Sequence, residues 1–283
     1  MNIAVKMEEG LMALRHGDCS LAQESFQAVI TADPSQDLAR YYLALALAKL
    51  DRLTEAVGHL KTLTRAGGPV EYYLTLGQVL LMLDQFSDAR RAYEAALAIQ
   101  PGPGPRVGLG LVALKARNWT EAEGIFRALV GDYPAESEYL FRLGQALGRQ
   151  NRGPEAEDCL TAALVMRPEA YEYHMELCEL LKRSGQTDRV RALMIKAIKD
   201  HPADLRYQVA RAEFEMESRN WEAAAAIYAA LTQNDESNFR YLFPLAKALG
   251  WQGNYGISRV ALKKAYDEMH IQMANSLKQE PGS

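Results

Sequence analysis

A repeat of about 34 residues constrains this chain more than any other feature of its sequence. A proline closes six successive segments: Pro34, Pro69, Pro101, Pro134, Pro168 and Pro202. A small residue recurs about twelve residues earlier, and the series runs on past the last proline: Ala22, Ala56, Ala89, Ala122, Ala156, Val190, Ala224 and Ser258. Four residues after each comes a large apolar one: Phe26, Leu60, Tyr93, Phe126, Leu160, Met194, Tyr228 and Leu262. The chain therefore divides into eight similar units.

Each unit has the pattern of two short amphipathic helices. In the fifth unit, leucines at helical spacing mark a first helix: Leu140, Leu143 and Leu147. A second helix follows with Ala156, Leu160, Ala163 and Leu164. Turn residues separate the two helices, as in Gly17-Asp18, Arg117-Asn118, Asn151-Arg152-Gly153, Gly185-Gln186 and Gly253-Asn254. The closing proline cannot continue the second helix and helps to end it.

This pattern resembles the tetratricopeptide repeat (TPR) family. The resemblance rests on the alanine of the second helix, the closing proline, and the pairs Leu76-Gly77, Leu109-Gly110 and Leu143-Gly144. The register starts units at residues 3, 37, 70, 103, 137, 171, 205 and 239. The resemblance implies an all-α superhelical solenoid of antiparallel helix pairs, with the first helices on a concave surface. We expect one solenoid over residues 3–270 and a polar C-terminal tail over 271–283.

The small residues have a physical purpose in this pattern. Two helices that cross closely need Gly, Ala or Ser in one and a bulky side chain in the other. A single helix pair cannot bury its apolar face alone, whereas a stack of eight can.

Composition narrows the class of protein. Hydrophobic residues make up 48% of the chain and charged residues 24%, and the formal net charge is −4. Such a charge gives no bulk attraction to nucleic acid, and no apolar run has the length of a membrane-spanning helix. The first ten residues lack an apolar signal core, and three cysteines form no disulfide framework. We expect a cytoplasmic protein.

His174 and Cys178 lie four residues apart among three glutamates, and His/Cys pairs are ordinary zinc ligands. In the repeat register, however, Cys178 takes the eighth position of its unit, which other units fill with glycine or alanine: Gly10, Ala44, Gly77, Gly110, Gly144, Ala212 and Ala246. Buried free cysteine behaves as a small apolar side chain. We interpret the pair as packing and expect no metal and no cofactor.

The segment Gly102–Gly108 (GPGPRVG) suggests a phosphate-binding loop. Such a loop needs a preceding strand and free backbone N–H groups, whereas a helix is expected here and proline lacks that donor. We interpret the segment as a rigid turn between repeats. No catalytic motif appears elsewhere, and the repeats leave too few residues for a catalytic domain. The chain is therefore not expected to be an enzyme.

The resemblance implies that the fifth position of each first helix lines the groove. All eight are apolar: Met7, Tyr41, Leu74, Val107, Phe141, Met175, Val209 and Phe243. A contiguous apolar strip on a soluble protein marks a binding surface, unless a neighbouring helix or the tail covers part of it. Tyr41 and Phe141 are the expected aromatic anchors.

Charged residues accompany this strip. The thirteenth position of a first helix is basic in five units: Arg15, Lys49, Lys115, Arg149 and Arg183. These cations either offset the helix dipole or form a stripe for an acidic partner. In later units, Glu179 and Glu213 favour basic groups of a partner instead.

The sequence thus predicts a non-catalytic adaptor that binds an extended peptide or a helix of another protein, with the acidic part of that partner against units one to five. The partner is expected to be neither nucleic acid nor membrane. Two alternatives stay open: a scaffold that self-assembles through its terminal repeats, and an enzyme or metal-binding protein. The chain itself is expected to be a monomer or to self-associate weakly.

Overall fold

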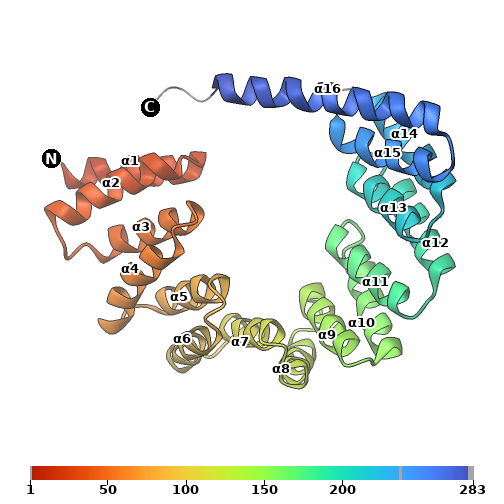
Figure 1. The fold of residues 1–283 in the computed structure, drawn as a ribbon. Coiled ribbons are helices and arrows are strands. Elements are labelled where there is room, and N and C mark those ends of the chain that lie inside the picture. The colour runs from red at the N-terminus through yellow and green to blue at the C-terminus, as the bar shows by residue number, and fades with distance from the viewer. Residues whose placement is uncertain (1, 236–237, 280–283) are drawn as a thin grey trace. The chain divides into compact units, whose positions relative to one another are not determined.

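The computed structural model describes residues 2–235 and 238–279, and every regular element in this part of the chain is an α-helix (Figure 1). The first ten helices are α1 (Ile3–His16), α2 (Cys19–Ala32), α3 (Asp37–Lys49), α4 (Leu53–Arg65), α5 (Val70–Met82), α6 (Phe86–Ile99), α7 (Pro103–Lys115), α8 (Trp119–Asp132), α9 (Ser137–Arg149) and α10 (Gly153–Met166). The last six are α11 (Tyr171–Arg183), α12 (Thr187–Asp200), α13 (Leu205–Glu217), α14 (Trp221–Asn234), α15 (Phe239–Trp251) and α16 (Tyr255–Gln279).

The odd-numbered helices are the first helices of the repeats. They begin at Ile3, Asp37, Val70, Pro103, Ser137, Tyr171, Leu205 and Phe239, which are the residues that start the eight units in the sequence register. The all-α solenoid architecture expected from the sequence is confirmed.

The helices form two compact units, Met1–Met166 and Arg167–Ser283. In the first unit, each second helix packs against the first helix of the next repeat, as α2 does against α3 and α8 against α9. Figure 1 shows α3, α5 and α7 on the inner side of this unit's curve and α4, α6 and α8 on its outer side. In the second unit, α12 packs against α13 and α14 against α15 in the same way.

The turn inside each repeat has the same backbone conformation in all eight. Its fifteenth residue lies in the left-handed region, with φ between 55° and 83°. Glycine takes this conformation without strain and supplies it at Gly17, Gly185 and Gly253. The other repeats place there Asp51, Asp84, Arg117, Asn151 and Arg219. The turn geometry therefore belongs to the repeat and not to glycine.

Close helix crossings explain the small residues. A Cβ atom placed on Gly110 would lie 2.6 Å from Cζ of Phe126, the large apolar residue of the same repeat. Gly144 and Leu160 have the same relationship, at 2.8 Å from Cγ of the leucine. The small residue near the start of the second helix is fully buried in seven repeats: Ala22, Ala56, Ala89, Ala122, Ala156, Val190 and Ala224.

Two sequence interpretations are corrected by the structure. The segment Gly102–Gly108 is not a turn throughout, because α7 begins at Pro103. Proline suits the first turn of a helix, where its missing N–H would have no intrahelical partner. The second correction concerns the C-terminal tail of residues 271–283, since α16 continues to Gln279; residues 280–283 lie outside the described residues.

Candidate functional site

A cleft of about 660 Å³ lies on the fourth and fifth repeats. We call it the basic cleft, and its lining residues are Leu111, Leu114, Lys115, Arg117, Trp119, Arg142, Gln145 and Arg149. Four of these side chains are cationic and none is acidic, although the whole chain has a net charge of −4. The cleft is therefore a local concentration of positive charge.

Two successive first helices form the walls of the basic cleft. Leu111 and Lys115 lie one turn apart on α7, and Gln145 and Arg149 take the same repeat positions on α9. Residues four apart on a helix share a face, so each pair projects on the same side. Lys115 and Arg149 are the last residues of their helices, where a cation also offsets the partial negative charge of the helix end.

The turn between α7 and α8 supplies two further lining residues. Arg117 occupies the left-handed turn position with φ of 60°, a conformation that costs a non-glycine residue roughly 1–2 kcal/mol. Trp119 follows as the first residue of α8 and is half-buried. The turn thus places a guanidinium group and an indole ring at the same cleft.

Arg142 is held by contacts within α9. Its Nε donates to Oε1 of Glu138 at 2.7 Å, and its Nη1 donates to Oε1 of Gln145 at 3.1 Å. The guanidinium carbon also lies 5.0 Å from the centre of the Phe141 ring, within the range of a cation–π contact. Glu138 compensates part of the charge of Arg142, and Lys115, Arg117 and Arg149 are the other cations of the cleft.

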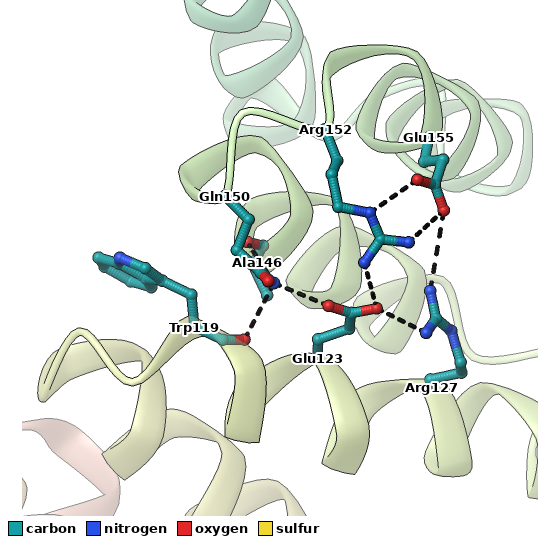
Figure 2. Close-up of polar contacts among 7 residues, drawn as sticks. All are labelled: Trp119, Glu123, Arg127, Ala146, Gln150, Arg152 and Glu155. Carbon is teal, nitrogen blue, oxygen red and sulfur yellow. Dashed lines mark hydrogen bonds and ion pairs between the residues drawn. The ribbon is translucent and has the colours of Figure 1, made fainter.

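A polar network that includes the backbone carbonyl of Trp119 joins the fourth repeat to the fifth (Figure 2). The buried carboxylate of Glu123, on α8, accepts hydrogen bonds from Arg152 Nη1 at 2.6 Å and Gln150 Nε2 at 2.8 Å. Gln150 also donates to the backbone carbonyl of Trp119 at 3.3 Å. Arg127 pairs with the same carboxylate at 2.5 Å. The network therefore fixes the start of α8, which carries Trp119, to the turn that follows α9.

Glu123 is ionised in this environment. Burial alone would raise the pKa of its carboxyl group. The hydrogen bonds from Gln150 and Arg152, together with the charges of Arg127 and Arg152, outweigh burial and lower the pKa below its ordinary value. A buried charge with this many partners is a structural contact between repeats.

Within the first compact unit, the expected groove residues differ in their surroundings. Met7, Tyr41 and Leu74 are partly buried and pack against the hydrophobic core of α1–α7. The hydroxyl group of Tyr41 also lies 3.1 Å from Oγ1 of Thr75, in the next first helix. Val107 is half-buried as well.

Phe141, one of the two expected aromatic anchors, is buried, and its contact with a partner stays a prediction. Its side chain is only 4% exposed, because it packs inside the repeat under the guanidinium group of Arg142.

The expected basic residues are divided among several places. Lys115 and Arg149 meet in the basic cleft, whereas Arg15 and Lys49 are exposed at the ends of α1 and α3. In the second compact unit, Arg183 is exposed at the end of α11.

The remaining expected groove residues also lie in the second unit. Met175 is half-buried, and Val209 packs against a small hydrophobic cluster. Phe243 lies 5.2 Å from the ring of Tyr266 on α16. Glu213 is exposed, and Glu179 pairs with Lys182 at 3.5 Å.

Sequence reasoning missed Arg117, Trp119 and Arg142 as site residues. They lie at the fifteenth, seventeenth and sixth positions of their repeats, whereas the expected site residues come from the fifth, ninth and thirteenth positions. One signal was present in the sequence: a tryptophan follows a basic turn directly, as Arg117-Asn118-Trp119.

His174 and Cys178 are both buried in the second unit. Nδ1 of His174 lies 3.1 Å from the hydroxyl oxygen of Tyr207 and 3.2 Å from the carbonyl oxygen of Ala170. Burial raises the pKa of the Cys178 thiol to about 12, so the thiol is protonated at neutral pH. Within residues 2–235 and 238–279, no three His, Cys, Asp or Glu side chains form a group suited to a metal ion. The same residues contain no helix that is long and apolar enough to cross a membrane.

The chain matches a family model described as "Tetratricopeptide repeat" over most of its length. The matched segments are residues 7–71, 74–137, 107–170, 141–189 and 179–239. No curated protein sequence shows a significant match.

Solved structures share this fold at low sequence identity. A tetratricopeptide repeat protein from Parabacteroides merdae ATCC 43184 is 16% identical, with a TM-score of 0.68 over 93% of this chain and 98% of its own. The thermophilic TPR protein TTC0263 from Thermus thermophilus is 19% identical, with a TM-score of 0.51 over 63% and 98%. A chain of the APC/C hetero-tetramer Cut9–Hcn1 is 18% identical, with a TM-score of 0.57 over 72% and 41%.

Proposed function

Because the chain belongs to the tetratricopeptide repeat family, we propose that it is a non-catalytic adaptor whose basic cleft binds an acidic, extended segment of a partner protein. Proteins of this family generally act through protein–protein interactions. The Cut9–Hcn1 structure is itself a hetero-tetramer, which supports a role of the fold in binding protein chains.

The observation that carries the proposal is the composition of the basic cleft. Lys115, Arg117 and Arg149 present positive charge, and Trp119 presents an aromatic surface beside them. Arginine forks match carboxylates in geometry as well as charge, and tryptophan is enriched among the few residues that dominate binding energy at protein interfaces. An acidic segment with an apolar side chain satisfies both features.

The shape of the cleft favours an extended segment over a folded domain. Its volume of about 660 Å³ falls in the range of pockets that enclose small ligands or a few side chains. An extended peptide presents its side chains singly, so a few carboxylates and one apolar group reach the lining residues. Charge steers such a segment to the cleft and makes its association depend on salt.

Direct binding of a defined peptide tests the proposal. The probe is a fluorescent peptide of alternating Glu and Leu, and its matched control has Gln at every Glu position. We expect the acidic peptide to bind more tightly, and its affinity to fall as the salt concentration rises. Anisotropy titrations at two salt concentrations give both quantities.

Two cleft variants and one matched control locate the binding site. Lys115→Glu and Arg149→Glu each reverse one charge of the basic cleft, and we expect each to weaken binding by about 10-fold or more, or about 1.4 kcal/mol. Lys49→Glu makes the same change at the equivalent position of α3, outside the cleft, and should bind like the wild type. Equal losses in all three variants would indicate a general charge effect and contradict the proposed site.

A native partner would then be recovered by pull-down from the source cell and identified by mass spectrometry. Its binding segment should be acidic, and it should compete with the Glu–Leu peptide. A partner that binds unchanged to both cleft variants would place the working surface elsewhere.

A further inference from the structure

The last repeat leaves apolar side chains exposed that are buried in every other repeat. The large apolar residue of the second helix is between 0 and 5% exposed in the first seven: Phe26, Leu60, Tyr93, Phe126, Leu160, Met194 and Tyr228. Its counterpart Leu262, on α16, is 39% exposed. Within each compact unit, the next repeat's first helix packs against this second helix. Leu262 thus lies on a surface that a further first helix would cover.

A hollow marks the same surface. It has a volume of about 740 Å³ between α15 and α16, and its lining includes Phe243, Trp251, Tyr255 and Leu262. Lys247 is the one charged residue in its lining. Trp251 and Tyr255 are largely exposed, although repeat proteins ordinarily have a polar outer face on their terminal repeats. We call this surface the C-terminal face.

The first repeat shows the complementary exposure. The tenth residue of the first helix is between 0 and 7% exposed in the seven later repeats: Ala46, Val79, Val112, Ala146, Leu180, Phe214 and Ala248. Its counterpart Met12, on α1, is 53% exposed. Val5 lies two turns earlier on the same side of α1 and is also exposed, with exposed Glu8 between them. These three residues form what we call the N-terminal face.

We infer that the C-terminal face of one copy of this chain binds the N-terminal face of a second copy, so that α1 and α2 of the second copy stack as a further repeat. Interior repeats show what such a contact looks like, because each buries the counterparts of Met12 and Leu262. One partner fits both faces, since the two faces are the opposite sides of the same repeat-to-repeat contact. Glu8 on one face and Lys247 on the other carry opposite charges. This association is separate from peptide binding in the basic cleft.

The symmetry of the contact predicts how the assembly grows. The two faces differ, so the contact is heterologous: each added copy leaves one free face of each kind. The average mass should therefore rise steadily with protein concentration and should not stop at a dimer, unless the rotation between copies closes a ring.

Light scattering and sedimentation of the full chain test this, over roughly 1 to 100 µM, a range suited to contacts of micromolar affinity. We expect the wild-type mass to increase across the range. Met12→Glu removes the N-terminal face and Leu262→Glu removes the C-terminal face, so each variant alone should have the mass of a single chain. Met82→Glu is the matched control, because Met82 is 54% exposed but lies on an interior repeat, and it should associate like the wild type.

Mixing Met12→Glu with Leu262→Glu tests directly whether the two faces bind each other. Each keeps the face that the other lacks, so an equimolar mixture should form a complex of two chains and no larger species. Circular dichroism verifies that each variant is folded, and Tyr255→Glu replaces Leu262→Glu if the latter is not.

Two results would overturn the inference. One is a wild-type chain with a constant, single-chain mass over the whole concentration range. The other is a Met12→Glu chain that still self-associates and whose mass does not rise when Leu262→Glu is added. Such a chain would associate by a contact between two identical faces.

Discussion

The carboxylate of Glu123 in the fourth repeat accepts a hydrogen bond, at 2.6 Å, from Arg152 in the fifth. Twenty-nine residues separate them in the sequence, and the carboxylate is buried at the helix contact that they share. Repeats of this kind are coupled mainly by apolar packing between neighbours. Here a charged pair adds to that coupling beside the basic cleft.

Arg152→Ala should weaken the contact between the fourth and fifth repeats more than the same change does elsewhere. It leaves the buried Glu123 without its Arg152 hydrogen bond, and an undercompensated buried charge is costly. Arg52 is the matched control: it occupies the same repeat position and also pairs with a following glutamate, but it reaches Gln23 instead of a buried carboxylate. Hydrogen exchange should show lost protection in α8 and α9 for Arg152→Ala, and little change near Arg52 for Arg52→Ala. Equal losses of protection in the two variants would mean that the buried Glu123 charge adds nothing to the stability of the contact between repeats.

Two glycine substitutions in the fourth repeat should have opposite effects. Gly110→Ala places a Cβ atom 2.6 Å from the buried Phe126 ring and should destabilise the protein by about 1–3 kcal/mol, as overpacking does. Gly124→Ala adds a methyl group in open space on α8 and should stabilise it by about 0.5–1 kcal/mol, because alanine favours a helix. Urea denaturation measures both. A stabilising Gly110→Ala would contradict the close crossing of α7 and α8.

Phe141→Ala should primarily reduce stability. Its side chain is buried, and truncation of a buried phenylalanine costs about 3–5 kcal/mol. Binding of the acidic peptide should change only as far as Arg142 loses its packing against the ring. Peptide affinity, measured below the melting temperature of the variant, separates the two effects. A stable variant with lost binding would restore Phe141 as a direct contact.

The second compact unit should lose stability as the pH falls below about 6.5. Burial lowers the pKa of His174 below its ordinary value of 6.5, although its contact with the Ala170 carbonyl opposes the shift. As the pH falls, the unfolded chain therefore binds a proton before the folded chain does, and folding weakens until the folded pKa is passed. His201, Asp200, Lys196 and Tyr207 are the ionisable groups that surround His174.

Hydrogen exchange of α11–α13, corrected for the intrinsic pH dependence of exchange, measures this loss. The exchange rates must be compared helix by helix and not for the whole chain, because burial also lowers the pKa of His59 in the first unit. His174→Gln should remove the pH dependence in α11–α13, and His270→Gln, which changes an exposed histidine, should not. An unchanged pH dependence in His174→Gln would assign it to another group.

The sequence predicted the repeat starts well because the pattern occurs eight times. Small and large residues such as Gly110 and Phe126 must meet at every helix crossing, so each repeat gives an independent indication of the same register. The end of α16 was harder to predict. His270 stands where earlier repeats have proline, and the following residues are polar but favour helix, so composition alone gave no stop signal.

The basic cleft was only half predictable, for a related reason. Comparison of repeats reveals what they share, and it identified Lys115 and Arg149 at a common position. The seventh repeat has the same Arg-Asn-Trp turn at residues 219–221, so the residue types of Arg117 and Trp119 did not mark them as cleft residues. Their relevance follows from their place in the lining of the basic cleft. The burial of Phe141 could not be predicted either, because the repeat register gives its position on α9 but not how much of its side chain neighbouring residues cover.

The polar pairs between repeats differ from one junction to the next. Arg90 of the third repeat pairs with Glu121 of the fourth, whereas the fourth offers the carboxylate of Glu123 to Arg152 of the fifth, so the sign of the charge reverses from one junction to the next. In the second unit, Arg191 of the sixth repeat meets the buried carboxylate of Glu215 in the seventh. Exchanging repeats would therefore separate these partners and leave the buried carboxylates of Glu123 and Glu215 without Arg152 and Arg191.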